Sequence, residues 1–292
     1  MKYAYYPGCS AESTARDMHQ STLAVAGALG IEMIEPKGWT CCGATAGHQT
    51  DRVLAASLPA ANLIKIKDMG LDCVVNCAAC YNRMKVANHE ISQKSNIRSK
   101  VTEAIGRDYD GKVKIKHFIE VLLDDIGLEK IRTAIRNPLN GLKVACYYGC
   151  LLVRPPKVVN FDDSENPKSL DKLVRAAGGQ AIDWPYKVEC CGGGLSLSRT
   201  DVVVNLTDSI LGMAQSSGAN CIAVSCPMCQ VNLDLRQQDV KKQTGNNYQM
   251  PIVYITQLLG LGLGISSKKL GFDKLMVTAS SVLEKVKGSS NG

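Results

Sequence analysis

Short apolar runs and longer amphipathic stretches alternate along this chain, and the alternation occurs twice. Short apolar runs bounded by turns are typical of buried strands, whereas apolar residues at every third or fourth position are typical of helices. In the first half, the pattern predicts strands at 2–6, 31–36 and 72–76 and helices at 13–29 and 50–70. In the second half, it predicts strands at 142–148, 180–185 and 220–225 and helices at 170–177 and 200–218.

Capping and helix-breaking residues refine these helices. Asp51 and Asp201, each preceded by a threonine, are candidate N-caps, and Gly70 and Gly218 follow the ends of the same two helices. Pro59 lies inside the first of them. Because proline lacks a backbone N–H, we expect a kink or break at this position.

The repeated strand–helix order predicts an α/β fold with one small parallel sheet in each half of the chain. A loop at 137–141 contains Asn-Pro and Asn-Gly, which favour turns, and separates the two halves. We therefore expect two domains, at 1–140 and 141–292.

Cysteines repeat with the same period as the predicted elements. The chain has 13 cysteines, about three times the average usage, and ten of them form two sets. Each of the last four cysteines of the first set has a counterpart 149 residues later in the second set, whereas the first cysteines, Cys9 and Cys150, are 141 residues apart. The second copy therefore holds about eight extra residues between its first cysteine and its Cys-Cys pair. The sets are Cys9, Cys41, Cys42, Cys77 and Cys80, and Cys150, Cys190, Cys191, Cys226 and Cys229.

Each of these cysteine elements follows the end of a predicted strand. The carboxyl ends of parallel strands share one edge of a sheet, where open α/β folds bind their ligands. We therefore expect the five thiols of each copy to converge on one point.

Composition and charge exclude several classes of protein. The chain is 45% apolar, too much for a disordered chain, and 5% aromatic, too little for a base-stacking module such as an RRM. The net charge of +7 is compatible with an anionic small substrate, and the absence of a basic stripe or zinc-finger spacing argues against nucleic acid.

The N-terminal segment and the overall hydropathy favour a cytoplasmic location. The chain reaches the turn Pro7-Gly8 too soon for the apolar region of a signal peptide. It contains no run of 18 apolar residues that could span a membrane. In the cytoplasm, clustered thiols bind metals or carry out redox chemistry more often than they form structural disulfides.

Five thiols per copy favour an iron–sulfur cluster. A structural zinc ion takes four ligands, one fewer than each copy offers. The side chains of two adjacent cysteines point apart, which suits a cluster with several irons better than one ion. Zinc in one or both sites, or a disulfide or thiol relay, remains an alternative. The ferredoxin run C-x2-C-x2-C-x3-C-P is absent, so an ordinary ferredoxin cubane is not encoded.

The repeated pattern Cys-x31-Cys-Cys-Gly-x33-Cys-x2-Cys, with a longer first spacer in the second copy, resembles the CCG-domain family. The resemblance covers nearly the whole chain and is greatest to the catalytic, CCG-containing subunit of the heterodisulfide reductases of methanogenic archaea. The segments CYYGCLLVRPP at 146–156 and FDDSENP at 161–167 strengthen it. It implies two duplicated Rossmann-like CCG domains related by pseudo-twofold symmetry.

The resemblance also implies the cofactor and its ligands. Each CCG motif of the family binds a noncubane [4Fe-4S] cluster through five cysteines. All ten motif positions are cysteine in this chain. By position, one cluster would use Cys9, Cys41, Cys42, Cys77 and Cys80, and the other Cys150, Cys190, Cys191, Cys226 and Cys229.

By the same resemblance, the chain is a disulfide oxidoreductase that reduces CoM-S-S-CoB to the thiols of coenzyme M and coenzyme B between the two clusters. Electrons would come from two partner subunits of the same complex, one with cubane [4Fe-4S] clusters and one with a flavin, coupled in turn to a hydrogenase or formate dehydrogenase. The alternatives are a related protein acting on another sulfur substrate in sulfur oxidation, an electron-transfer subunit of a fumarate reductase or 2-hydroxy-acid oxidase, and a zinc-stabilised scaffold.

A few residues outside the cysteine sets are candidates for the site. His48, close to the first Cys-Cys pair, is a candidate proton donor. Arg154 and Lys157, in the extra loop of the second copy, are candidates for contacts with an anionic substrate. Gly192, with the two glycines that follow it, lets the backbone approach sulfur.

The remaining cysteines and histidines are expected to be structural. Cys73, Cys146 and Cys221 lie in predicted strands, where free cysteine acts as a small hydrophobe. His19, His89 and His117 are expected in helices, with surface or core roles. Glycines at 260–264 lack the spacing of a dinucleotide fingerprint.

Overall fold

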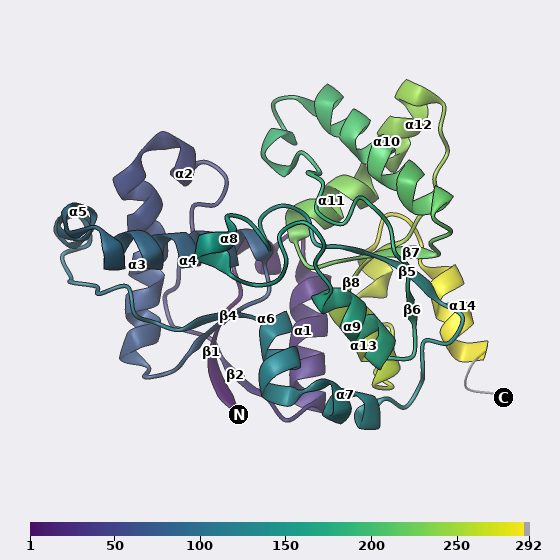
Figure 1. The fold of residues 1–292 in the computed structure, drawn as a ribbon, viewed down its shortest axis with the longest axis horizontal. Coiled ribbons are helices and arrows are strands. Elements are labelled where there is room, and N and C mark those ends of the chain that lie inside the picture. Colours follow the sequence, from purple (N-terminus) through teal and green to yellow (C-terminus); the bar gives the residue numbers. More distant parts are fainter. Residues whose placement is uncertain (289–292) are drawn as a thin grey trace.

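Two four-stranded parallel sheets, each flanked by helices, form the framework of the protein (Figure 1). The computed structural model describes residues 1–288. In spatial order, the first sheet consists of β2 (Glu32–Ile34), β1 (Lys2–Tyr6), β3 (Cys73–Val75) and β4 (Ile115–His117). The second sheet repeats this order with β6 (Gln180–Ala181), β5 (Lys143–Tyr147), β7 (Cys221–Val224) and β8 (Ile252–Tyr254). The predicted duplicated α/β fold is thereby confirmed.

The main helices follow the same order in both copies. The first copy contains α1 (Arg16–Ala28), α2 (Gly47–Thr50), α3 (Arg52–Asp68), α4 (Ala78–Gln93), α5 (Ser95–Ile105), α6 (Phe118–Glu120) and α7 (Leu128–Ala134). The second contains α8 (Pro156–Val159), α9 (Ser169–Ala176), α10 (Thr200–Ser216), α11 (Pro227–Leu235), α12 (Gln237–Thr244), α13 (Ile255–Gly262) and α14 (Ser280–Gly288). In order, α1, α3, α4, α5 and α6 correspond to α9, α10, α11, α12 and α13. None of the helices within residues 1–288 combines the length and the apolarity needed to cross a membrane.

Most of the predicted elements are confirmed, with three corrections. Each sheet has a fourth strand, β4 or β8, which the sequence pattern misses because the strand runs directly into a helix without an intervening turn. The predicted break at Pro59 is wrong: α3 is continuous, and its packing against α4 and α5 outweighs the one backbone hydrogen bond that a buried proline removes. The predicted cap at Asp201 is also wrong, because its carboxylate pairs with Arg199 instead of a backbone N–H, whereas Asp51 accepts a bond from Leu54 N at 2.8 Å.

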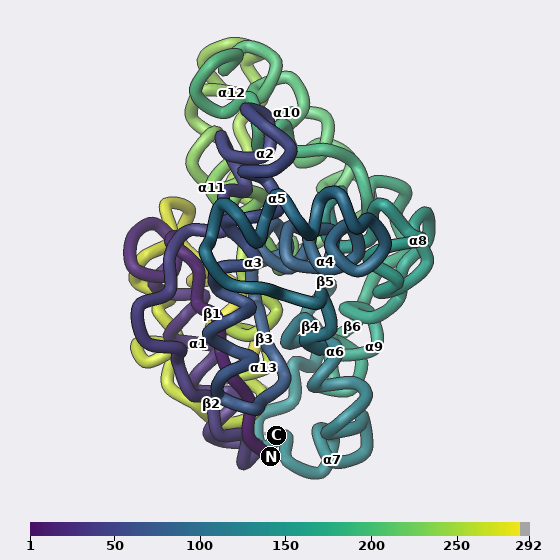
Figure 2. Tube along the Cα trace, turned by 90° about the vertical axis from the view of Figure 1, so that its left-hand side faces the viewer, coloured from purple at the N-terminus to yellow at the C-terminus, as the bar shows by residue number. Residues whose placement is uncertain are grey.

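Reciprocal helix contacts join the two copies. The first helix of the first copy, α1, packs on α13 of the second copy, and α9, the counterpart of α1, packs on α7 (Figures 1 and 2). The hydroxyls of Ser21 and Thr256 meet across the α1–α13 contact at 2.7 Å, and both side chains are fully buried. This exchange of contacts is the arrangement expected of two copies related by pseudo-twofold symmetry. The division at residue 140 stays a prediction.

A buried charged network supports the first cysteine loop of the second copy. The carboxylate of Asp171 in α9 accepts a hydrogen bond from the Tyr148 hydroxyl at 2.6 Å and another from Lys187 Nζ at 2.9 Å. The side chains of Asp171 and Lys187 are only 2% and 4% exposed. Because Tyr148 lies two residues before Cys150, this network fixes the loop that carries the cysteine.

We predict that Asp171→Ala lowers the free energy of unfolding by about 3–5 kcal/mol, because it leaves the Lys187 ammonium buried without its partner. Asp201→Ala is the matched control, since this aspartate also pairs with a cation in the first turn of a helix but is exposed, and it should change stability little. Denaturant unfolding of the two variants in the same metal-loading state measures the difference. Equal losses in both would contradict the role assigned to Asp171.

Candidate metal centre

Strand ends bring the cysteine elements of each copy together. Cys9 follows the end of β1 by three residues, and Cys77 follows the end of the adjacent strand β3 by two. The second copy repeats both spacings, with Cys150 after β5 and Cys226 after β7. In both sheets the chain order reverses between these two central strands, which is where open α/β sheets bind ligands.

A tyrosine at the end of each first strand holds the Cys-Cys pair of its copy. The hydroxyl of Tyr6 donates to the carbonyl of Thr40, and that of Tyr147 donates to the carbonyl of Glu189, both at 2.6 Å. Each carbonyl belongs to the residue immediately before a Cys-Cys pair. The same device thus positions the adjacent cysteines in both copies.

Glycine before the first cysteine lets two loops approach each other closely. Gly8 and Gly149 have φ values of +78° and +64°, a conformation that favours glycine. A Cβ added to Gly8 would lie 3.0 Å from Cys80 Sγ, and one added to Gly149 would lie 3.0 Å from Cys229 Sγ. Each glycine therefore allows the first cysteine loop to lie against the C-x-x-C motif.

The thiols of each set lie against one another. In the first set, Cys41 Sγ lies 3.8 Å from Cys9 Sγ, and Cys42 Sγ lies 3.2 Å from Cys80 Sγ. In the second set, the sulfur atoms of Cys191 and Cys229 are 3.5 Å apart.

The two sets also meet. The thiols of Cys77 and Cys226 lie close enough to shift each other's pKa, so the first cysteines of the two C-x-x-C motifs are neighbours across the boundary between the copies. Both thiols are buried at the start of helices, α4 and α11. A reactant bound beside this contact would therefore lie close to both cysteine sets.

Thiol–thiol hydrogen bonds divide the cysteines into protonated and ionisable groups. Hydrogen bonds from Cys41 and Cys80 lower the pKa of Cys42 well below its usual range. A hydrogen bond from Cys150, together with the N–H of Gly192, lowers the pKa of Cys190 to about 6. Hydrogen bonds from Cys229 and Cys77 lower the pKa of Cys226. In each copy, neighbouring thiols thus lower the pKa of at least one cysteine, which favours the thiolate form that binds metal.

Backbone N–H groups point at the sulfur atoms of both Cys-Cys pairs. Gly43 N donates to Cys41 Sγ at 3.4 Å, and Gly192 N donates to Cys190 Sγ at 3.3 Å. Both glycines have a φ of +73°, a conformation that favours glycine, so the chain can turn directly after each Cys-Cys pair. The sequence-based expectation that Gly192 brings backbone close to sulfur agrees with this contact.

The donor set fits an iron–sulfur cluster better than a single ion. All thirteen thiols are free. In the part of the chain that the structure describes, no three Cys, His, Asp or Glu side chains are placed around one point as ligands of a single metal ion. The fit rests on chemistry: five soft thiolate ligands per copy, from three separate loops, suit a cluster with several irons.

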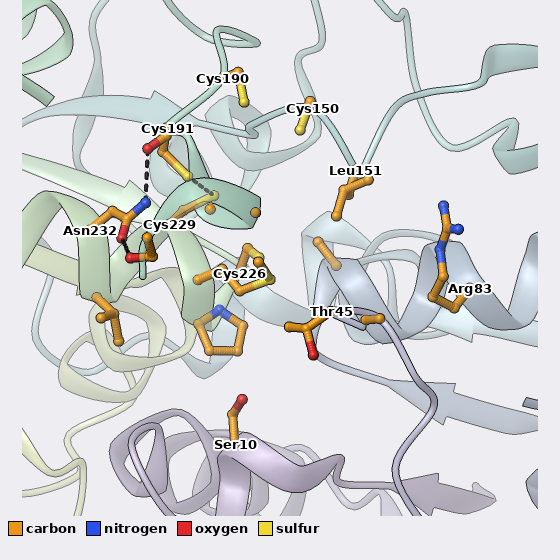
Figure 3. A pocket seen from close by; sticks show the side chains of 18 of the residues that line it. Ser10, Thr45, Arg83, Cys150, Leu151, Cys190, Cys191, Cys226, Cys229 and Asn232 are labelled. Atoms are coloured by element: carbon orange, nitrogen blue, oxygen red, sulfur yellow. Dashed lines mark hydrogen bonds between the residues drawn. The ribbon is translucent and has the colours of Figure 1, made fainter. Parts of the chain in front are cut away.

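A cavity of about 560 Å³ lies between the two copies (Figure 3). The second copy lines it with all five of its cysteines and with Leu151 and Asn232, and the first copy with polar side chains such as Ser10, Thr45, His48 and Arg83. In Figure 3, Cys191 and Cys229 stand on one side of the cavity and Thr45 and Arg83 on the other. The cavity therefore offers a thiol-rich wall from one copy and a polar wall from the other.

The structure brings only some of the predicted substrate-binding residues to this cavity. His48 lines it, and its half-buried ring has a buried Nδ1 with no hydrogen-bond partner among residues 1–288. Arg154 is outside the lining set; its guanidinium pairs with Glu165 at 3.0 Å. Lys157 is exposed in α8 and is also outside that set. A substrate contact for Arg154 and Lys157 stays a prediction.

The cysteines outside the two sets are buried in strands. Burial raises the pKa of Cys73 and Cys146, and it raises that of Cys221 to about 12. All three thiols are fully buried, as expected of small apolar side chains.

The other histidines lie outside the cavity. His19 contacts the Tyr5 hydroxyl at 3.3 Å, and His89 is exposed on α4. His117 is not in a helix, as the sequence predicts, but ends β4, where its buried ring contacts the Asn76 carbonyl at 3.1 Å. Burial lowers the pKa of His117 to about 3.

Sequence reasoning misses two residues of the first copy. Arg83 follows Cys80 by three positions and lines the cavity, and its neighbour Asn82 contacts the second copy. The signal available in the sequence is position: Arg83 occupies the place that Asn232 occupies after the second C-x-x-C motif, and Asn232 also lines the cavity.

Comparison with known proteins agrees with this geometry. The CCG family, described as a cysteine-rich domain, matches residues 3–85 and again 144–234. The chain belongs to this family. Both matches run from the first strand of a copy past its C-x-x-C motif, so they contain all ten cysteines of the two sets.

Relatives of this CCG protein include subunits of two enzymes, a fumarate reductase and a heterodisulfide reductase. It is 31% identical to the 8-methylmenaquinol:fumarate reductase membrane anchor subunit of Wolinella succinogenes, over 95% of this chain and 98% of that one. It is 30% identical to a subunit of the ferredoxin:CoB-CoM heterodisulfide reductase of Methanosarcina mazei, over 100% and 99% of the two chains. A hypothetical protein from Helicobacter pylori has a similar fold, with a TM-score of 0.76 and 12% identity over 95% of this chain and 52% of that one.

We predict that Cys42→Ala and Cys191→Ala each remove about four irons from the metal-loaded chain and leave the other site filled, because each cysteine belongs to one complete set. Cys73→Ala and Cys221→Ala are the controls, since these thiols lie in the strands below the sites and should leave iron unchanged. Iron analysis of the four purified variants measures this. A loss of iron in either control would show that the ligand assignment is wrong.

Proposed function

We propose that this protein reduces a small organic disulfide, R–S–S–R′, to two thiols at iron–sulfur centres held by its ten paired-set cysteines. The reaction consumes two electrons and two protons, and it breaks the S–S bond. The physiological substrate we propose is the disulfide of coenzyme M and coenzyme B, the substrate named for the Methanosarcina relative.

The observation that carries the proposal is the cavity. All five cysteines of the second set line a space of about 560 Å³, and Cys226 in that lining is a close neighbour of Cys77 of the first set. A volume of this size suits a small-molecule substrate. Two noncubane [4Fe-4S] clusters, bound by the two sets, would supply the electrons one at a time.

The side chains of the protein would bind, orient and protonate. The α1–α13 packing holds the two copies in a fixed arrangement, so a disulfide in the cavity would lie against the second cysteine set and close to Cys77 of the first. The ring of His48 lies in the lining and can supply a proton to a departing thiolate sulfur. Electrons would arrive from partner subunits of the same complex, which we take to be one that holds cubane iron–sulfur clusters and one that holds a flavin.

We expect the metal-loaded chain, reduced with a low-potential dye, to release two thiols for every two electrons consumed from the coenzyme M–coenzyme B disulfide. Cys191→Ala should abolish the release and Cys221→Ala should retain it. Thiol titration against dye oxidation provides the measurement. Dye oxidation without thiol release, or release that survives in Cys191→Ala, would rule out the proposed reaction.

We predict that His48→Gln lowers kcat for thiol release by about 10²–10⁴-fold at saturating reductant, the usual effect of losing a general acid. His89→Gln is the control, because His89 is exposed on α4 and lies outside the cavity lining. Substrate affinity and iron content should not change in either variant. An unchanged kcat in His48→Gln would remove this residue from the mechanism.

A second candidate function is electron transfer within a quinol:fumarate reductase. The full-length match to the Wolinella succinogenes protein favours it. In that case the metal-loaded chain would accept electrons and pass them to a fumarate-reducing partner, and it would not release thiols from a disulfide. The thiol titration described above separates the two functions.

A further inference from the structure

The polar wall of the cavity carries one strong charge. Apart from cysteines, the lining residues within 1–288 are neutral or apolar except for Arg83, with His48 and Tyr148 as the other titratable side chains. Arg83 projects from α4, whose first residue, Ala78, also lines the cavity. A half-buried guanidinium at a small-molecule cavity is suited to binding a carboxylate, sulfonate or phosphate.

Within residues 1–288, Arg83 has no carboxylate partner. Its hydrogen bond runs from Nη2 to the side-chain oxygen of Asn82, a neutral group, at 2.6 Å. The acid nearest along the helix, Glu90, is engaged by Arg52 at 2.6 Å and by Lys94 at 2.9 Å. Partial burial lowers the pKa of the Arg83 guanidinium, and the charges of Cys42 and Glu90 oppose this shift without forming an ion pair with it.

The extra loop of the second copy fixes the direction of Arg83 through Asn82. The Asn82 amide Nδ2 donates to the carbonyl of Leu151 at 3.0 Å and to that of Arg154 at 2.5 Å. Because both amide hydrogens point at the loop, the amide oxygen must face Arg83, from which it accepts its bond. Asn82 is fully buried, so this orientation is set by packing between the copies.

The corresponding residue of the second copy is used differently. Asn232 occupies the position of Arg83 after its C-x-x-C motif, but its amide donates to the Cys191 carbonyl at 2.8 Å and accepts from Ser196 at 2.5 Å. Both hydrogen bonds hold the Asn232 amide against the Cys-Cys loop of its own copy (Figure 3). The two copies therefore offer the cavity one cation and one satisfied amide, which makes the cavity electrostatically asymmetric.

We propose that Arg83 is the anion-recognition residue of this cavity, that it binds a sulfonate, phosphate or carboxylate of the substrate, and that Asn82 is its positioning residue. This proposal rests on the proposed function, in which the substrate of the cavity is a small disulfide. The extra loop then contributes to specificity through its backbone carbonyls, which hold Asn82, rather than through its own cationic side chains.

Binding to the oxidised, metal-loaded chain tests the proposal without turnover. The probes are bis(2-sulfonatoethyl) disulfide and its neutral counterpart, bis(2-hydroxyethyl) disulfide, titrated calorimetrically. Arg83→Gln should weaken binding of the sulfonate probe by about 10- to 100-fold, the effect of losing a charge-assisted hydrogen bond. It should change binding of the neutral probe less than about twofold, within measurement error of the wild type.

Matched variants separate recognition from folding. Arg98→Gln removes the same charge from an exposed arginine on α5 that pairs with Asp108, and it should leave both affinities unchanged. Arg83→Lys keeps the charge without the guanidinium fork and should give an intermediate affinity. Iron content must stay at the wild-type value in each variant.

A double-mutant cycle tests the positioning role. Asn82→Ala should weaken binding of the sulfonate probe in the wild-type background but not further in the Arg83→Gln background, because it acts through that guanidinium. A purely structural role for Asn82 would instead weaken both probes in both backgrounds, and that result would overturn the assignment.

Two outcomes would overturn the role of Arg83. In one, Arg83→Gln binds the sulfonate probe as the wild type does; in the other, Arg154→Gln alone loses the affinity. Failure of the proposed function gives a different result: the wild type binds the sulfonate probe through Arg83, but the reduced chain does not cleave it. The anion site would then stand without the disulfide reaction.

Discussion

The parallel pairing of β1 with β3, and of β5 with β7, is the interaction on which the rest of the structure depends. It places the ends of two neighbouring strands at the same edge, so that the single cysteine and the C-x-x-C motif of a copy emerge side by side. The strand on the other side of β1 is β2, and the strand on the other side of β5 is β6; each is followed in the chain by the Cys-Cys pair of its copy. A tyrosine hydroxyl then ties each pair back to the first strand. The cysteine loops of each copy thus gather at one edge of its sheet because of backbone hydrogen bonding, before any metal is considered.

Duplication converts one such edge into a cavity with two unlike walls. The helix contacts between the copies, α1 on α13 and α9 on α7, hold the two cysteine sets near each other, with Cys77 close to Cys226. Within this frame the copies have diverged. One presents its five cysteines to the cavity, and the other presents His48 and Arg83. An asymmetric substrate can be oriented only because the pseudo-symmetric halves differ in this way.

The sequence predicts features that repeat and misses those that depend on contact between the copies. The cysteine spacing predicts the convergence at the strand ends, since this follows from local strand order, and the place of His48 near the Cys-Cys pair makes it a candidate. Arg83 and Asn82 escape the sequence pattern because their role depends on which helix face meets the extra loop. The expectation for Pro59 fails because tertiary packing maintains a helix that local propensity would interrupt.

The most direct test of this account is the metal content of the intact chain after assembly with iron and sulfide. Two five-cysteine sites filled by [4Fe-4S] clusters predict about eight irons per chain, together with acid-labile sulfide. About two zinc ions per chain without sulfide would contradict the account, because each set would then serve as a tetrahedral structural site and the cavity between them would have no source of electrons.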